Sequence, residues 1–221
     1  MEARPLDGVV DALTEIRDAG TTFLAIMTGR PISELLELLG DLGIPVSGSQ
    51  GTEFRWPNGT TQRHEPSGAV DRRLVRAQSE AEAIAPANRV ERKLASVALH
   101  TRGLPEERAG RLQEAVSAAW SLDADDRDLE CRRFSGGVEL RLKGMDKGTA
   151  LRALLDGRRE DALRVYVGDD ETDEDAFEAL LDGGIGIKVG PRGVRTKAHG
   201  RLESPEAVRA FLMVWIGVTT R

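Results

Sequence analysis

The sequence lacks the features that mark several large classes of protein. A single cysteine, Cys131, among 221 residues excludes an internal disulfide, so we expect a reducing compartment, the cytoplasm. The longest apolar run, residues 210–218, is far shorter than the ~20 residues of a membrane-spanning helix, and the opening residues predict no signal peptide. Lys and Arg number 31 against 37 Asp and Glu, a net charge of -6, which argues against nucleic acid as a partner.

The apolar residues that are present fall into strand-like runs separated by helical spacings. Forty per cent of the residues are hydrophobic, enough for a packed core. Strands are predicted over Phe23–Met27, over Arg164–Val167 and within residues 184–190, with helical patterns after them. This alternation predicts an α/β core with a mostly parallel sheet, whose ligands lie at the carboxyl ends of the strands.

The pattern changes in the middle of the chain, where an α+β module interrupts this core. The elements predicted there are a hairpin turn at Asn58-Gly59, helices over residues 69–84 and 105–120, a strand over Val90–His100, and two strands joined at Gly136-Gly137. The strand over Val90–His100 needs a bulge if it is to keep one apolar face. We therefore expect a core in two parts, residues 1–62 and 145–221, around an α+β cap of residues 63–144.

Six acidic side chains occupy the seven positions from Asp169 to Asp175, directly after a predicted strand. One or two acids would suit the start of a helix, but six repel one another, and a cation offsets that repulsion. Asp169 and Asp173 lie at the strand end and in the first helical turn, which suits Mg²⁺, a cation that takes oxygen ligands. Asp173 can alternatively cap the helix. The pattern favours a metal site.

Two further polar groups stand at the starts of predicted helices. The segment "MTGR" supplies the Thr28 hydroxyl, free backbone N–H groups and the Arg30 guanidinium, which together suit a phosphoryl group. Lys147 lies just ahead of another predicted helix, where a lone lysine is ordinarily a solvated charge. Metal carboxylates, a hydroxyl and a lysine together predict phosphoryl-transfer chemistry.

These motifs resemble a known family. "MTGRP", "KGMDKGTAL" and "GDDETDEDAF" are similar, in that order, to the second, third and fourth motifs of the haloacid-dehalogenase (HAD) superfamily. "GDDETDEDAF", "DKGTAL", "GSQGTEF" and "VERKLASVALHTR" resemble the trehalose-6-phosphate phosphatases more narrowly. The resemblance implies a Mg²⁺-dependent hydrolase with a HAD-like core, an inserted cap and a sugar phosphate as substrate.

The resemblance also implies a role for each matching residue. Asp169 is expected to ligate Mg²⁺, and Asp173 to support the metal or the lysine. Thr28 is expected to bind a phosphoryl oxygen, Lys147 to balance the charge of nucleophile and phosphate, and Arg30 to orient the phosphoryl group. The cap residues implied in holding sugar hydroxyls are Glu91, Lys93 and Glu139, and less directly His100, Arg102 and Arg141. From the alternation pattern alone, an ordinary solvent-facing sheet would explain these cap charges.

One expected motif is missing. The family's first motif, Asp-x-Asp-Gly-Thr at the end of a central strand, supplies the nucleophile and the acid/base, and residues 1–20 contain no such pair. Asp7-Gly8 has no apolar strand before it and is expected to begin a helix over Val9–Arg17. We therefore expect the first core strand to be absent and this chain to have negligible turnover. Gln50 also stands where the family usually has His.

Three hypotheses follow. In the first, the chain is an N-terminally truncated trehalose-6-phosphate phosphatase. In the second, it is a HAD phosphatase for another sugar phosphate, such as sucrose phosphate. In the third, it is a catalytically inactive module that binds a sugar phosphate, docked on a trehalose-6-phosphate synthase subunit.

Overall fold

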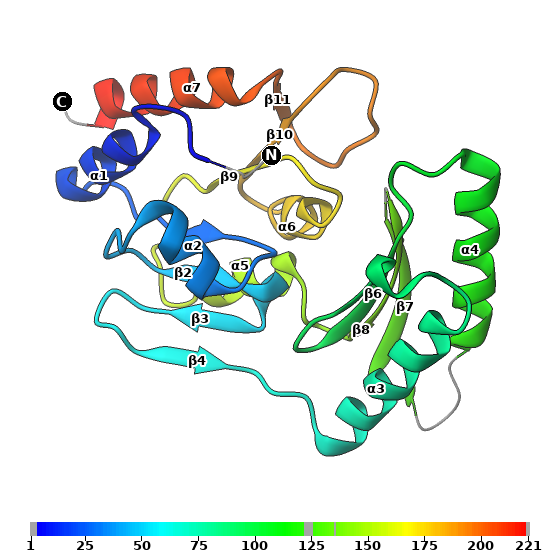
Figure 1. The fold of residues 1–221 in the computed structure, drawn as a ribbon. Coiled ribbons are helices and arrows are strands. Elements are labelled where there is room, and N and C mark those ends of the chain that lie inside the picture. The colour runs from blue at the N-terminus through cyan, green and yellow to red at the C-terminus, as the bar shows by residue number, and fades with distance from the viewer. Residues whose placement is uncertain (1–3, 122–125, 135, 220–221) are drawn as a thin grey trace. The chain divides into compact units, whose positions relative to one another are not determined.

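A computed structural model of the chain describes residues 4–121, 126–134 and 136–219 (Figure 1). The chain forms two compact units: unit 1 comprises Met1–Arg63 with Asp146–Arg221, and unit 2 comprises His64–Met145. In the described part of the chain, the helices are all too short or too polar to cross a membrane.

Unit 1 is an α/β unit with two small sheets. Its helices are α1 (Val9–Ala19), α2 (Ile32–Leu39), the 3-10 helix η1 (Ser49–Gly51), α5 (Lys147–Leu155), α6 (Asp173–Ala179) and α7 (Pro205–Thr219). Its strands are β1 (Ile26–Met27), β2 (Val46–Gly48), β3 (Glu53–Arg55), β4 (Thr61–Arg63), β9 (Val165–Gly168), β10 (Ile185–Val189) and β11 (Gly200–Leu202).

The two sheets of unit 1 have the orders β1-β2-β3-β4 and β11-β10-β9. Pairing is parallel between β1 and β2 and throughout the second sheet, whereas β2, β3 and β4 pair antiparallel. The predicted hairpin turn at Asn58-Gly59 is confirmed: it joins β3 to β4, and Gly59 has φ 82°, which glycine adopts readily.

Helices cover both faces of β1, so that side chains of opposite parity meet different helices. Leu24, just before β1, packs against the cluster of Ile16 and Ile216 from α1 and α7, which lie side by side in Figure 1. Met27 on the other face packs with Tyr166 of β9 and Phe177 of α6. This three-layer packing is that of a doubly wound α/β core.

The first predicted strand is shorter than expected. The apolar run Phe23–Met27 predicts a strand of that length, but only Ile26 and Met27 are in strand conformation with a paired neighbour, β2. The physical reason is that β1 is an edge: among the described residues, no strand pairs with its other side.

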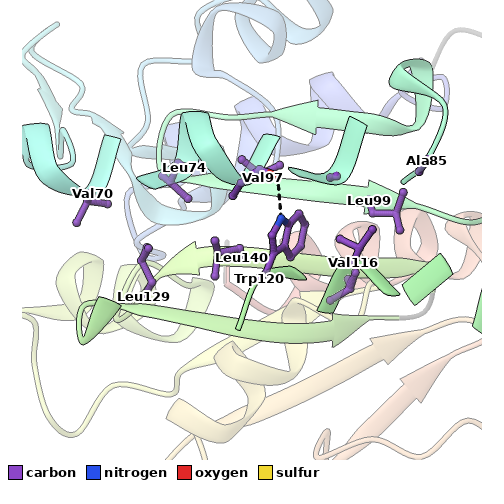
Figure 2. Packing of buried hydrophobic residues seen from close by; sticks show 12 residues of the cluster. Val70, Leu74, Ala85, Val97, Leu99, Val116, Trp120, Leu129 and Leu140 are labelled. Carbon is purple, nitrogen blue, oxygen red and sulfur yellow. Dashed lines mark hydrogen bonds between the residues drawn. The ribbon is translucent and has the colours of Figure 1, made fainter. Parts of the chain in front are cut away.

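Unit 2 is a two-layer α+β unit. Its elements are α3 (Gly68–Glu82), the 3-10 helix η2 (Ala87–Arg89), β5 (Val90–Arg92), β6 (Ser96–His100), α4 (Glu106–Ala119), β7 (Leu129–Phe134) and β8 (Gly137–Leu142). The sheet order is β5-β6-β8-β7, and every pair is antiparallel. Both helices pack on one face of this sheet through a cluster that includes Leu74, Leu99, Val116 and Leu140 (Figure 2).

Trp120, at the end of α4, is the largest side chain of this cluster and is fully buried. Its indole Nε1 donates to the carbonyl oxygen of Ala77 in α3 at 2.8 Å, the dashed line in Figure 2. A buried indole N–H usually finds such a partner. Trp120 therefore ties α4 to α3 across the hydrophobic core.

The single strand predicted over Val90–His100 was wrong. The chain reverses at residues 93–95, where the backbone N–H of Lys93 donates to the carbonyl oxygen of Ser96 at 2.9 Å. Arg92 and Val97 face each other in two antiparallel strands, β5 and β6. The turn resolves the parity conflict that a single strand would have needed a bulge to accommodate.

Candidate active site

The predicted hydroxyl lies directly after β1. The backbone N–H of Thr28 donates to the carbonyl oxygen of Ser47 at 2.9 Å, which extends the pairing with β2 by one residue. The Thr28 Oγ1 accepts a hydrogen bond from the backbone N–H of Arg30 at 3.1 Å. Because this bond uses an oxygen lone pair, the hydroxyl proton remains available for an acceptor such as a phosphoryl oxygen. Arg30 itself is exposed and pairs with Glu34 at 3.2 Å.

Glu53 of β3 fixes the start of the helix that follows Thr28. Pro31 precedes α2 and provides no side-chain cap. Instead, the buried carboxylate of Glu53 accepts from the backbone N–H of Ile32 at 3.1 Å and from Arg63 Nη2 at 2.6 Å. A carboxylate at a helix N-terminus is favourable, so Glu53 anchors the turn that carries Thr28 and Arg30.

The loop with Gln50 closes over the same turn in an unusual backbone conformation. Ser49 and Gln50 have φ of 49° and 59°, the left-handed region, and Gly51 has φ 96°. A Cβ on Gly29 would lie 2.7 Å from Gln50 Nε2, so a larger residue at position 29 would displace the Gln50 side chain. The Gln50 Oε1 is buried with no hydrogen-bond partner among the described residues. Backbone strain and unpaired polar atoms of this kind gather at functional sites.

Lys147 and Asp173 form a buried ion pair at the carboxyl end of β9. Lys147 is the first residue of α5, and its Nζ lies 2.6 Å from Asp173 Oδ1. The same oxygen accepts from the Tyr166 hydroxyl at 2.6 Å, and Asp173 Oδ2 accepts from the backbone N–H of Asp170 at 2.7 Å. Both oxygens of Asp173 are therefore engaged, and the carboxylate holds the ammonium group in place.

The environment of Tyr166 follows from the same contacts. Burial raises the pKa of the Tyr166 hydroxyl strongly, and the negative charge of Asp173 and the hydrogen bond to it raise that pKa further. Asp169 adds a smaller electrostatic contribution in the same direction. The hydroxyl consequently stays protonated and acts as a donor to Asp173.

Asp169 directly follows β9 and is exposed. Its carboxylate has no recorded hydrogen bond or ion pair within the described residues, which leaves its oxygens accessible. Mg²⁺ is commonly held by one or two carboxylates together with substrate phosphate and waters. Over residues 4–121, 126–134 and 136–219, no group of three or more acidic, His or Cys side chains is arranged to hold a metal ion. The residues present thus fit Mg²⁺ in part, because the accessible Asp169 carboxylate can supply one oxygen ligand.

The acidic loop is held from the neighbouring strand by Lys188 of β10. Its buried Nζ donates to the carbonyl oxygen of Asp170 at 2.7 Å and lies 3.7 Å from Glu174 Oε1. Glu174 also accepts from Thr196 Oγ1 at 2.8 Å. The crowded acids are therefore stabilised partly by a lysine and by hydrogen-bond donors.

The loop after β2 connects the Thr28 turn to the lysine. A Cβ on Gly51 would lie 2.9 Å from the carbonyl oxygen of Asp146 and 3.0 Å from Ala150 Cβ, both at the start of α5. Gln50, the residue before Gly51, contacts Gly29 in the turn after Thr28. The 3-10 helix η1 therefore bridges that turn and the start of α5, where Lys147 lies. The structure thus brings the two halves of the predicted phosphoryl site to one edge of unit 1.

The predicted cap residues gather on the polar face of the unit 2 sheet. Glu91 and Glu139 lie on either side of Ala98, and Lys93 Nζ lies 3.7 Å from Glu91 Oε2 and 3.6 Å from Glu139 Oε1. His100 Nε2 is 2.7 Å from Glu91. The His100 hydrogen bond lowers the pKa of the Glu91 carboxyl, partial burial opposes it, and the Lys93 charge also lowers it.

The remaining cap residues contribute unequally to this face. Arg141 is buried, and its Nε donates to Glu130 at 2.7 Å. The carbonyl oxygen of Arg102 accepts from Arg89 Nη1 at 3.2 Å, outside the Glu91–Lys93–Glu139 group. The polar face of unit 2 is therefore a paired network of charges rather than a row of independently solvated side chains.

Sequence reasoning missed three residues of the unit 1 site: Tyr166, Lys188 and Glu53. Tyr166 lies within the predicted strand Arg164–Val167, and nothing in that pattern marks it, although it is the single tyrosine of the chain. Lys188 interrupts the apolar segment "GIGIKVG", and a lysine inside a buried parallel strand is itself a signal. Glu53 had no such signal, because its partner Ile32 is 21 residues away.

Comparisons with known proteins agree with the motifs. The family model for trehalose-phosphatase matches residues 1–205. The chain is 33% identical over 222 residues to the trehalose-phosphate phosphatase of Mycobacterium marinum, covering 95% of this chain and 55% of that protein. It is 34% identical over 226 residues to the corresponding protein of Mycolicibacterium paratuberculosis, with 95% and 56% covered. The chain therefore spans about half the length of the curated relatives it matches.

Solved structures give the fold. The C-terminal domain of Candida albicans trehalose-6-phosphate phosphatase matches with a TM-score of 0.82 at 19% identity, covering 98% of this chain and 86% of that one. The C-terminal domain of the Candida albicans trehalose synthase regulatory protein matches at 0.74 and 11% identity, covering 93% and 85%. A haloacid dehalogenase-like hydrolase from B. subtilis matches at 0.63 and 15%, covering 92% and 90%. The predicted HAD-like fold is confirmed, and the chain belongs to the trehalose-phosphatase family.

Proposed function

We propose that this chain carries most of the site of a Mg²⁺-dependent phosphatase that hydrolyses trehalose 6-phosphate to trehalose and phosphate. The observation that carries the proposal is the buried Lys147–Asp173 pair beside Asp169, at the same edge of unit 1 as the Thr28 hydroxyl. Membership of the trehalose-phosphatase family supports the substrate. The single cysteine supports the cytoplasm as the compartment.

Each unit 1 residue has a task that follows from its contacts. Thr28 donates its hydroxyl proton to a phosphoryl oxygen, since its Oγ1 already accepts from Arg30. Lys147 uses one N–H for Asp173 and offers the others to the phosphoryl group and the nucleophile. Asp173 is a positioning residue, because its two oxygens are taken by Lys147, Tyr166 and Asp170. Arg30 is the orienting cation of the phosphoryl group.

The metal and the sugar complete the proposal. Asp169 would hold Mg²⁺, which supplies positive charge against the negative charge of the phosphoryl group when bound. Glu91, Lys93 and Glu139 would bind sugar hydroxyls, for which their network of carboxylate oxygens and an ammonium group is suited.

We infer that the nucleophile is not among residues 1–221. These residues contain no Asp-x-Asp-Gly-Thr motif, so no carboxylate of the expected kind is supplied to attack phosphorus and release the sugar hydroxyl. Without a nucleophile no covalent intermediate forms, and positioning alone leaves only a small residual rate. We propose that the chain by itself is an inactive part of the enzyme and that Mg²⁺ does not restore turnover.

Phosphate release from trehalose 6-phosphate tests the proposal directly. The 221-residue chain should stay at background with MgCl₂, whereas the chain preceded by an apolar strand ending in Asp-x-Asp-Gly-Thr should release phosphate. Replacing the first Asp of that strand by Asn should return the rate to background. A normal rate for the 221-residue chain, or none for the extended one, would overturn the proposal. A clear preference for sucrose phosphate would favour the second hypothesis.

The third hypothesis, an inactive module that binds a sugar phosphate, is the second candidate function. The missing motif is the observation that favours it. In that case the charges of the cap serve binding alone, and a trehalose-6-phosphate synthase subunit is the proposed partner. Calorimetry of the 221-residue chain with trehalose 6-phosphate and MgCl₂ measures whether the chain binds the sugar phosphate. No heat of binding would remove the basis of this alternative.

A further inference from the structure

A cavity of about 350 Å³ lies within unit 2, beside the first turns of α3. We call it the α3 cavity. Val70 and Leu129, which Figure 2 shows at the same end of the core cluster, form the apolar part of its lining. The charged part comes from three arginines and two aspartates: Arg72, Arg73, Arg76, Asp126 and Asp128. Three guanidinium groups around one cavity indicate an anionic ligand.

Arg73 is the buried member of the three arginines and is only 9% exposed. Its Nε lies 3.2 Å from Asp126 Oδ1, and its Nη1 lies 3.3 Å from Glu80 Oε2. Its Nη2 is withdrawn from solvent and has no hydrogen-bond partner in the described part of the chain. Such a group is rare, because it has lost water without gaining an acceptor. A ligand oxygen in the cavity would be that acceptor, once the exposed side chains beside Arg73 turn aside.

The other two arginines are exposed and lie one helical turn apart on α3. Arg76 Nε pairs with Glu80 Oε1 at 2.9 Å. Arg72 has no recorded hydrogen bond or ion pair with any described residue. A Cβ on Gly68 would lie 3.5 Å from Arg72 Nη1, so this guanidinium lies over the first turn of α3. Arg72 therefore offers its N–H groups to a ligand at the start of the helix.

The first turn of α3 adds backbone donors to the cavity. Ser67 caps the helix, since its Oγ accepts from the backbone N–H of Val70 at 3.3 Å and its carbonyl oxygen accepts from that of Asp71 at 2.9 Å. Ala69 also lines the cavity, and its backbone N–H has no recorded acceptor among the described residues. The N-terminus of a helix is partly positive and binds anions through such groups. The helix and the arginines thus favour the same kind of ligand.

Asp128 restricts which anion fits. It lines the cavity, is exposed, and its carboxylate has no recorded hydrogen bond to any described residue. A carboxylate repels an anion without a proton, but it accepts a hydrogen bond from an anion that keeps one. Hydrogen phosphate keeps one hydroxyl at neutral pH, whereas sulfate keeps none. The lining therefore suits hydrogen phosphate better than other small oxyanions.

We propose that the α3 cavity binds a free hydrogen phosphate ion, whose oxygens accept from the arginines and the first turn of α3 and whose hydroxyl donates to Asp128. The residues proposed to hold sugar hydroxyls are not part of this lining, so the site is separate from the polar face of the sheet. It is also independent of the phosphatase reaction, because all of its residues belong to unit 2 and none of them has a task in that reaction.

The test compares three dianions of equal charge. At about pH 8 phosphate, sulfate and methyl phosphate all carry two negative charges, and only phosphate keeps a hydroxyl. Titration of the ¹⁵N-labelled 221-residue chain, followed by NMR, should move the amide resonances of Ala69 and Val70. The dissociation constant for phosphate should be about tenfold or more below that for the other two. Resonances of Thr28 and Arg30 report any phosphate bound by unit 1 separately.

Two outcomes of this titration would overturn the proposal. If phosphate leaves the resonances of Ala69 and Val70 unmoved, the α3 cavity is not an anion site. If the three dianions bind there with equal affinity, the ligand is not selected by its hydroxyl and hydrogen phosphate is the wrong assignment.

Substitutions at the arginines test the donors. Arg72→Gln should raise the dissociation constant for phosphate about tenfold. Arg111→Gln, which removes an exposed arginine paired with Glu107 on α4, is the matched control and should leave it within about twofold. Arg73→Lys keeps a positive charge beside Asp126 but has no Nη2, and should also raise it about tenfold. Equal dissociation constants for Arg72→Gln and Arg111→Gln would overturn the site even if Arg73→Lys does not fold.

Asp128→Asn tests the acceptor. Removal of its charge should let sulfate and methyl phosphate bind more tightly, because the repulsion is gone. The preference for phosphate should then fall from about tenfold to about threefold or less. An unchanged preference would contradict a phosphate hydroxyl that donates to Asp128.

Discussion

Units 1 and 2 bury their sheets in different ways. The four strands of unit 2 form one continuous antiparallel sheet, and two helices cover one face of it through a single apolar cluster. Unit 1 has two shorter sheets, and the edges that face each other, β1 and β9, border an apolar cavity. Unit 2 therefore closes its core with its own residues, whereas unit 1 leaves strand edges beside its core.

The polar sites of the two units differ in the same sense. In unit 2 the charges of Glu91, Lys93 and Glu139 compensate one another on one continuous sheet. In unit 1 the Lys147–Asp173 pair lies beside Asp169, whose carboxylate has no recorded hydrogen bond or ion pair among the described residues. An unpaired buried backbone group costs about 1–3 kcal/mol. A strand that paired with the free sides of β1 and β9 would satisfy such groups and stabilise unit 1.

The largest change in the free energy of unfolding is expected in unit 2. Trp120→Ala removes a fully buried indole and its hydrogen bond to Ala77, and should lower the free energy of unfolding by about 4 kcal/mol. Denaturant titration followed by circular dichroism measures it. Val75→Ala, on the exposed side of α3, is the matched control and should change the free energy by less than about 0.5 kcal/mol. A loss below about 1 kcal/mol for Trp120→Ala would mean that unit 2 does not depend on this core.

The second largest change in the free energy of unfolding is expected at the buried ion pair of unit 1. Lys147→Met leaves the buried Asp173 carboxylate without its cation and should lower the free energy of unfolding by about 3 kcal/mol. Adding Asp173→Asn should recover a large part of this loss, which a double-mutant cycle measures. Lys197→Met removes a half-exposed lysine paired with Glu178 and should cost less than about 1 kcal/mol. Equal losses for the two lysines would contradict the buried pair.

A smaller effect concerns pH. Tyr166 is the only tyrosine, so ultraviolet absorbance of tyrosinate reports this site alone. Its pKa is raised in the folded chain above the ordinary value of 10.0, so the stability it contributes is complete below pH 10.0. That stability falls as pH rises further, by about 1.4 kcal/mol per pH unit, because only the unfolded state ionises.

The measurement is an alkaline titration of the folded chain and of the chain in denaturant. Tyrosinate should appear near pH 10.0 in denaturant and only together with unfolding in buffer. Tyr166→Phe should remove this tyrosine's share of the alkaline loss of stability. Ionisation of Tyr166 near pH 10.0 in the folded chain would contradict its burial against Asp173.

The smallest effect is expected at the surface of unit 1. Arg30→Met breaks an exposed pair with Glu34 one helical turn away and should change the free energy of unfolding by less than about 0.5 kcal/mol. In the extended, active chain, the same substitution should raise KM for trehalose 6-phosphate. A loss of stability above about 1 kcal/mol would mean that Arg30 holds the turn itself rather than serving the substrate.

Local patterns predicted the elements that depend on local chemistry. The Asn58-Gly59 turn, the helix after Asp7-Gly8 and the helix after Thr28 all lie where their turn residues and apolar spacing place them. The prediction of a single strand over Val90–His100 was wrong, because the three-residue turn between β5 and β6 contains no Gly or Pro and the apolar pattern continues across it. The strand predicted over Phe23–Met27 was too long, because the length of a strand depends on pairing with a neighbour that is distant in sequence.

Some site residues were likewise predictable from local motifs, whereas others depend on contacts between distant parts of the chain. Thr28, Lys147 and Asp169 were predicted from motifs at strand and helix ends, and the structure places them at one edge of unit 1. The assignment of Asp173 to metal or lysine could not be decided from spacing, because it depends on Tyr166 and on the geometry of both Asp173 oxygens. These contacts favour the lysine. The roles themselves remain predictions until the substitutions are made.

Hydrogen exchange of the 221-residue chain alone tests the central claim most directly, since it compares the edge strands β1 and β9 of unit 1 with the central strands β6 and β8 of unit 2. We expect the amides of Met27 and Val167 to exchange at least about a hundredfold faster than those of Leu99 and Leu140, because only the latter lie in strands that are paired on both sides. Equal protection of the two pairs would show that the edges of β1 and β9 are already occupied, and would contradict an incomplete sheet in unit 1.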